Sequence, residues 1–217
     1  MERDQPPTTA GVYPSDYFRR QDESADTLFY AQPRLLVHID DYAIEAIRAY
    51  FSEALPAGGV ILDLLSSWRS HLPQELPVRQ VVGLGLNSVE MAENPQLDEH
   101  VVHDVNADST LPFDDGSFDA AVLTVSVQYL TKPAEVFAEV NRAVRAGGSF
   151  HVVYSNRMFP TKAVRIWQSL DDTRRAELIA SYFSHAGGWE EPQHLDISPK
   201  REFYTDPVYV VSARKRA

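Results

Sequence analysis

VILDLLSSWRSH, residues 60–71, reads as an apolar strand that ends at an aspartate and passes into a polar loop. QVVGLGLNS, residues 80–88, has the same strand-then-turn form, and residues 118–155 repeat it twice more. Strands that alternate with helical segments indicate a mostly parallel sheet with helices on both faces. We therefore expect an α/β fold built on a single doubly wound sheet.

The individual elements follow from apolar periodicity and from glycine and proline punctuation. Strands are expected at residues 60–63, 78–83, 100–104, 118–125, 149–155, 194–197 and 208–213. Helices are expected from Asp40 or Asp41 to Leu55, at 89–93, from Pro133 to the pair Gly147-Gly148, at 160–170 and at 173–185. The last two strands are expected to form an antiparallel hairpin. The prediction is a mostly parallel seven-stranded sheet with an antiparallel edge strand.

Length and composition favour a single domain preceded by an N-terminal arm. The chain has 217 residues, of which 44% are hydrophobic, and this is enough for one continuous core. Residues 1–27 are polar and show no period, so we expect a flexible N-terminal arm before a single domain at 28–217. The chain has no cysteine, which excludes disulfides and thiol nucleophiles.

The charge distribution bears on partners and location. The formal net charge is −11, and the one basic cluster is the tail Arg214-Lys215-Arg216. Nucleic-acid binding needs a basic patch, so we expect a small-molecule substrate and no nucleic-acid partner. The polar start has no apolar signal segment, and the longest apolar run, 120–127, is too short to cross a bilayer. We expect a cytoplasmic protein without membrane association; the sequence does not predict its oligomeric state.

The fold rule for open α/β sheets locates the candidate site. Ligands bind beyond the carboxyl ends of the strands, near the point where the strand order reverses. The segments that meet this condition are 63–71, 83–90, 103–107, 124–130 and 154–159.

Two further motifs resemble a known family. LPFDDGSFD, residues 111–119, is similar to the loop that leads into the fourth strand of small-molecule methyltransferases. EVNRAVRAGG, residues 139–148, is similar to the helix end that follows it in the same family, with Ala146 where proline is usual. The chain therefore resembles the class I S-adenosylmethionine-dependent methyltransferases, type 11-like, and the resemblance implies their Rossmann-like fold.

The resemblance implies S-adenosylmethionine as cofactor, with two departures from the family pattern. The loop at 65–70 has no glycine where the family uses glycines to approach the methionine end, and Gly85 stands where an acidic residue usually binds the ribose. Asn87 or Glu90 is expected to replace that acid, Asn87 being preferred. The cofactor-binding residues expected on this basis are Asp63, Leu65, Ser66, Ser67, Gly85, Leu86, Asn87, Asp104, Val105, Asn106, Thr124 and Ser126.

The unusual loop resembles a subgroup pattern. DLxSSWxSHxP at 63–73, a glycine-rich turn at 82–87 and SNRMF at 155–159 are similar to a subgroup of methyltransferase-like proteins of bacteria and plants. This resemblance implies that the glycine-free loop is a group feature, and it implies no substrate.

Methyl transfer is an in-line displacement, so positioning does most of the work. A general base is needed where the acceptor must lose a proton. We expect Tyr129, His38 and Asn156 as the catalytic candidates, because they lie near the ends of strands four and five or in the segment before strand one. Packing of Tyr129 and a bond from His38 to Asp40 or Asp41 are the structural alternatives.

Other functions stay open at this point. A non-catalytic binding protein is indicated by the missing glycines and the missing ribose acid. Gly83-x-Gly85-x-x-Ser88, with Asp104 further on, partly matches a dinucleotide fingerprint and suggests an NAD(P)-binding protein. His100 and His103 are too poorly placed on a strand for us to expect a metal site.

Overall fold

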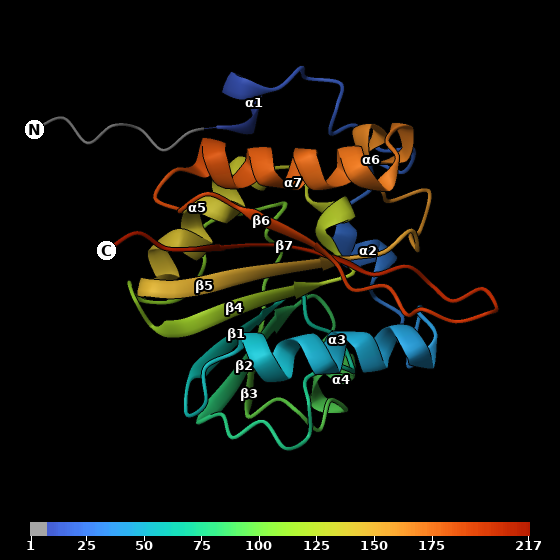
Figure 1. Cartoon of the computed structure of the whole chain (residues 1–217). Coiled ribbons are helices and arrows are strands. Elements are labelled where there is room, and N and C mark those ends of the chain that lie inside the picture. The colour runs from blue at the N-terminus through green and yellow to red at the C-terminus, as the bar shows by residue number, and fades with distance from the viewer. Residues whose placement is uncertain (1–7) are drawn as a thin grey trace, which may run out of the picture.

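The computed structural model describes residues 8–217, and it contains one seven-stranded sheet (Figure 1). The strands are β1 Val60–Leu64, β2 Gln80–Gly85, β3 Glu99–Val102, β4 Phe118–Thr124, β5 Val144–Tyr154, β6 Gln193–Asp196 and β7 Tyr209–Arg214. Their order is β3-β2-β1-β4-β5-β7-β6, with β7 antiparallel to both of its neighbours. The predicted mostly parallel sheet with an antiparallel hairpin at one edge is confirmed.

Helices cover both faces of this sheet. The helices are α1 Thr9–Val12, α2 Asp26–Phe29, α3 Asp41–Ala54, α4 Ser88–Ala92, α5 Pro133–Ala143, α6 Arg165–Ser169 and α7 Asp172–Ala186, with a 3₁₀ turn at Val127–Tyr129. In Figure 1, α5 and α7 lie on one face and α3 on the other. The helix expected at 160–170 begins only at Arg165, because Val164 is extended and its N–H donates to the Gln128 carbonyl at 2.9 Å.

Alternating side chains of β1 divide the core between the two faces. Leu62 and Leu64 are fully buried among α5 and α7, whereas Ile61 is fully buried in the cluster that includes the apolar side of α3. Each such side chain contributes about 2 kcal/mol by leaving water. Asp40 begins α3 as predicted, because its carboxylate accepts a 2.8 Å bond from the Ala43 N–H. The sheet is therefore packed from both sides.

The two methyltransferase-like motifs contact each other. Arg142 donates to the carbonyl oxygens of Leu111 at 2.9 Å and Phe113 at 2.8 Å, and it pairs with Glu139 at 2.8 Å. Arg142 is thereby held by bidentate, charge-assisted bonds. The motifs stabilise the entry into β4 and lie away from the strand ends that form the candidate site.

The double glycine has a different role from the one expected. The helix α5 ends at Ala143, before the pair Gly147-Gly148, which lies in the irregular first part of β5. Gly147 has φ of 73°, and a Cβ on Gly148 would come within 2.6 Å of the Asp119 carbonyl oxygen. The pair therefore permits the close approach of β5 to β4 and does not close the helix.

The N-terminal segment up to residue 27 was expected to be a flexible arm. Residues 1–7 lie outside the described residues. Of the remainder, Thr9 donates to Glu135 of α5, Phe18 is buried in the core, and Arg20 forms a buried ion pair with Asp26 at 2.7 Å. Residues 8–27 thus contact the body of the domain at several points.

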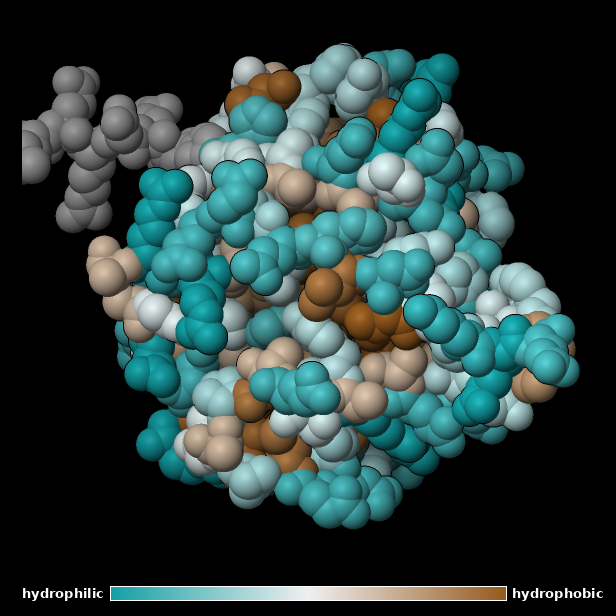
Figure 2. Space-filling view, viewed as in Figure 1, coloured by the Kyte–Doolittle hydropathy of each residue, from teal (hydrophilic) through white to brown (hydrophobic). Residues whose placement is uncertain are grey.

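The outer surface is mostly hydrophilic in the view of Figure 2, and apolar residues gather there into separate small patches. None of the helices within residues 8–217 is long and apolar enough to span a bilayer.

Candidate functional site

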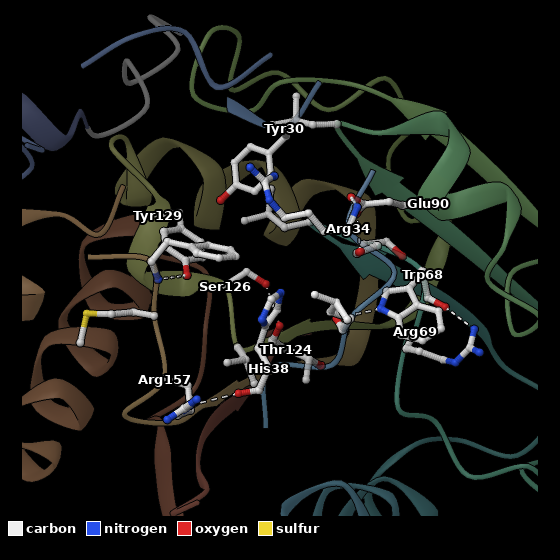
Figure 3. Close-up of a pocket in the computed structure, with 18 of the residues that line it drawn as sticks. Tyr30, Arg34, His38, Trp68, Arg69, Glu90, Thr124, Ser126, Tyr129 and Arg157 are labelled. Carbon is white, nitrogen blue, oxygen red and sulfur yellow. Dashed lines mark hydrogen bonds between the residues drawn. The ribbon is translucent and has the colours of Figure 1, made fainter. Parts of the chain in front are cut away.

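A cavity of about 630 Å³ opens at the carboxyl ends of the parallel strands, beside β1 and β4, between which the strand order reverses (Figure 3). This is the switch point at which open α/β sheets bind ligands, and the volume is within the range of small-molecule sites. Its walls come from the segments after β1, β2, β3, β4 and β5, and from residues 30–39, which we call the strap.

Backbone strain is concentrated at this cavity. Leu65, His71 and Val125 have φ of 55°, 56° and 52°, and they are the non-glycine residues with positive φ in residues 8–217. All three line the cavity. A bulky or β-branched residue in this region costs about 1–2 kcal/mol. The fold maintains three such residues at one place, which is typical of a functional site.

Asp63 organises the loop after β1. The carboxylate is buried, and Oδ2 accepts bonds from the Ser66 and Ser70 hydroxyls at 2.6 and 2.7 Å. Burial raises the pKa of Asp63 to about 6, against the lowering effect of these two hydroxyl donors. The aspartate therefore holds the loop in which Leu65 takes the left-handed conformation.

The loop also lies against β2. The Ser66 N–H donates to the Leu84 carbonyl at 2.8 Å, and a Cβ on Gly85 would overlap the Ser66 carbonyl oxygen. Gly85 was expected to contact the cofactor, but it lies behind the loop and is not among the cavity-lining residues. Gly83 likewise faces Leu97, so both glycines of the dinucleotide-like pattern serve close packing.

Asn87 joins the strap to the helix after β2. Its Oδ1 caps α4 by accepting bonds from Val89 and Glu90 N–H groups, and its Nδ2 donates to the Tyr30 carbonyl at 2.8 Å. The polar atoms expected to replace the ribose acid are thus engaged within the protein. Glu90 also lines the cavity, and it accepts bonds from the Ser67 hydroxyl at 2.6 Å and the Arg34 N–H at 2.7 Å.

The segment after β3 contributes a turn and an apolar surface. Asp104 accepts a 3.0 Å bond from the Asn106 N–H, which is the turn-capping alternative to a ligand contact. Asn106 donates to Asp26 and to the Tyr129 carbonyl, and it accepts from the Thr131 N–H. All these groups, with the buried Val105, line the cavity, apart from Thr131.

The ends of β4 and β5 provide polar atoms without partners. Thr124 Oγ1 and Asn156 Oδ1 are shielded from solvent and make no hydrogen bond in the described part of the chain. Ser126 donates to the Thr124 carbonyl at 2.7 Å. The Tyr129 hydroxyl accepts the Phe159 N–H at 2.8 Å, and burial raises the pKa of this phenol.

His38 lies on the strap at the cavity mouth. Its ring packs edge-on against Phe159, with centroids 4.9 Å apart, and Arg157 donates to its carbonyl at 3.1 Å. Burial, followed by the charge of Arg34, lowers the pKa of His38. The expected bond from His38 to Asp40 or Asp41 is not formed, because Asp40 instead caps α3. The lowered pKa of His38 favours the neutral imidazole.

Of the expected site residues, all except Gly85 line this cavity, although their individual roles stay predictions. Sequence reasoning gave no role to Arg34, His71, Arg157, Phe159 or Tyr204, which also line it. Arg34 lies in the same short segment as His38, and this proximity in the sequence could have indicated that Arg34 also lines the cavity. Within residues 8–217, no group of three His, Asp or Glu side chains is arranged to hold a metal ion.

Comparisons with known proteins agree with this geometry. Residues 67–152 match the profile of a methyltransferase domain family. The chain has the methyltransferase fold. No curated protein matches the sequence.

Three solved structures illustrate the similarity. The [4+2]-cyclase SpnF is 15% identical with a TM-score of 0.62, over 88% of this chain and 92% of that one. Phosphoethanolamine N-methyltransferase 2 of Haemonchus contortus, in complex with S-adenosylmethionine, is 14% identical with a TM-score of 0.57, over 80% and 53%. An S-adenosylmethionine-dependent methyltransferase of Mesorhizobium loti is 17% identical with a TM-score of 0.53, over 78% and 98%.

The residues of the cavity fit such a cofactor. The left-handed turn at Leu65 gives the loop the conformation that glycine usually supplies. The N–H groups of Ser67 and Trp68 have no backbone acceptor within residues 8–217. Adjacent main-chain donors of this kind bind anionic groups such as a carboxylate. The loop after β1 thus leaves two adjacent main-chain donors without a backbone partner among the described residues.

Proposed function

We propose that this chain is an S-adenosylmethionine-dependent methyltransferase that acts on a small-molecule acceptor. The observation that carries the proposal is the left-handed Leu65 at the carboxyl end of β1, which opens the loop onto the cavity. We also propose that the glycine-free loop is shared by the subgroup that the sequence resembles. In this subgroup Asp63 and its two serine donors replace glycine as the determinant of the loop conformation.

The cofactor is assigned to the part of the cavity nearest β1, β2 and β3. The loop at Leu65–Ser67 holds the methionine end, while Leu86 and Val105 provide apolar surface for the adenine. Glu90 has carboxylate lone pairs beyond the two it uses internally, so it replaces Asn87 as our candidate for the ribose hydroxyls. When bound, S-adenosylmethionine supplies a methyl group on a sulfonium sulfur, and that sulfur leaves as a neutral thioether.

The acceptor is assigned to the part of the cavity nearest β4 and β5. Tyr129 keeps its proton at neutral pH because burial raises its pKa, so it orients the acceptor and does not act as a base. His38 is unprotonated there and accepts the acceptor proton where one must leave. Asn156 also lines this part of the cavity and is a further candidate for orienting the acceptor. The strap forms one wall of this part of the cavity.

One observation favours a second candidate, a non-catalytic binding protein with this fold. The polar groups of Asn87, Asp104 and Asn106 are engaged in internal bonds, whereas the family resemblance implied that they bind cofactor. The structurally similar SpnF is named as a cyclase, so the fold is not restricted to methyl transfer.

Thermal unfolding with separate ligands distinguishes the candidates. A ligand present at 100 times its Kd stabilises the native state by about 2.7 kcal/mol. We expect S-adenosylhomocysteine to raise the Tm, and NAD to leave it unchanged. Stabilisation by NAD alone would support the dinucleotide alternative, and stabilisation by neither would favour the non-catalytic candidate.

A further inference from the structure

Arg34 brings an unneutralised guanidinium to the cavity wall. Its Nη2 donates to the Phe29 carbonyl at 2.8 Å, whereas Nη1 is shielded from solvent and has no partner. Arg34 forms no ion pair with any carboxylate in residues 8–217. Arg34 as a whole is half-buried, and a partly desolvated cation with an unused donor is stabilised when an anion binds it.

The guanidinium is held in place before any ligand arrives. Its central carbon lies 4.6 Å from the ring centroid of Phe29, 5.6 Å from Phe159 and 5.7 Å from Tyr30. The main chain is fixed as well, because the Arg34 N–H donates to Glu90. Figure 3 shows the Arg34 side chain beside Tyr30 on the cavity wall. A group fixed in this way loses little entropy when it binds a ligand.

The Arg34 main chain bonds to Glu90 on the cofactor side, whereas its guanidinium lies beside Phe159 on the acceptor side of the cavity. Phe159 follows β5 and stacks with Tyr129, which follows β4, with centroids 6.1 Å apart. Leu36 and Val37 add apolar surface from the strap. The cofactor, by contrast, is assigned to the ends of β1, β2 and β3. The chemistry around the guanidinium is therefore apolar and aromatic.

We propose that the acceptor carries a carboxylate on an apolar, ring-containing body, and that Arg34 binds the carboxylate. A guanidinium presents a planar fork that matches a carboxylate, and the rings beside it match the body of such a molecule. The role of this molecule as the methyl acceptor rests on the proposed function, whereas carboxylate binding by Arg34 does not.

The test compares phenylacetate with phenylacetamide, which has nearly the same shape and no charge. Binding is measured by calorimetry to the full chain, with and without S-adenosylhomocysteine. We expect the wild type to bind the acid about tenfold more tightly than the amide, as one charge-assisted bond provides. Arg34→Gln should abolish this preference, and Arg34→Lys should retain part of it. Arg165→Gln is the matched control, because Arg165 is exposed and pairs with Asp16 outside the cavity.

Each other outcome is decisive. Equal affinity for acid and amide in the wild type, or binding of neither at millimolar concentration, overturns the proposal. If Arg34→Gln weakens S-adenosylhomocysteine instead and leaves phenylacetate unaffected, the guanidinium binds the cofactor carboxylate and the proposal is likewise overturned. If S-adenosylhomocysteine fails to bind while the acid preference depends on Arg34, the inference stands and the proposed function fails.

Discussion

Ser67 donates its hydroxyl hydrogen to Glu90 Oε2 at 2.6 Å and thereby joins the loop after β1 to the helix after β2. The other oxygen of the same carboxylate accepts the Arg34 N–H at 2.7 Å. One buried side chain thus connects the loop, α4 and the strap across the cavity. This arrangement fixes three walls of the site without a glycine-rich loop.

Replacement of Glu90 by alanine should release the strap. The substitution leaves the Ser67 hydroxyl and the Arg34 N–H without their acceptor, which should cost about 1–3 kcal/mol of unfolding free energy. Hydrogen exchange should become faster at residues 30–38. Glu93→Ala, at an exposed position beside the same helix, should change neither quantity. Unchanged exchange in Glu90→Ala would mean that the carboxylate does not hold the strap.

Replacement of Leu65 distinguishes backbone strain from packing. Alanine keeps a Cβ in the left-handed region, whereas glycine does not, and both remove the leucine side chain. We expect Leu65→Gly to be more stable than Leu65→Ala by about 1 kcal/mol in denaturant unfolding. The opposite order would show that Leu65 is not under strain.

Asp63 should make the wild type less stable as pH rises. Its pKa is raised to about 6 in the folded chain from 3.8, so the folded state binds more protons than the unfolded state between these values. The contribution of protonated Asp63 to the unfolding free energy is complete below about pH 4 and is lost as pH rises through about 6.

Asp63→Asn removes this titration. The unfolding free energy of the variant relative to the wild type should therefore improve by up to about 3 kcal/mol between pH 4 and pH 7. The comparison is made by difference because burial lowers the pKa of His71 and His151 to about 4, which has the opposite effect on stability. A difference that does not vary with pH would mean that Asp63 ionises normally.

Asn87 has two separable roles. Asn87→Asp keeps the oxygen that caps α4 but removes the donor to the Tyr30 carbonyl, and Asn87→Ala removes both. We expect faster exchange of the strap amides in both variants. Only Asn87→Ala is expected to lose about 1 kcal/mol more in unfolding free energy, which is the usual value of an N-cap. Equal stability of the two variants would argue against the cap.

The sequence predicted the sheet, its order of elements and most of the cavity wall, because these follow from apolar periodicity and from the switch-point rule. It did not predict that Leu65 takes a glycine-like conformation, since local propensity favours the opposite and the loop is held by side-chain bonds from Ser66 and Ser70 to Asp63. Nor did it predict the bond between Arg34 and Glu90, which are 56 residues apart. The capping role of Asn87 could have been predicted, because asparagine directly before a short helix is a strong N-cap.

The central claim is that this cavity binds the cofactor despite its glycine-free loop. Calorimetric titration with S-adenosylhomocysteine tests it in the wild type, in Ser126→Trp and in Ser184→Trp. Ser126 lines the cavity, so tryptophan should fill it, whereas Ser184 is exposed on α7 outside the cavity. The account predicts micromolar binding to the wild type and to Ser184→Trp, with loss of binding in a folded Ser126→Trp. An absence of binding to the wild type at millimolar ligand would contradict it.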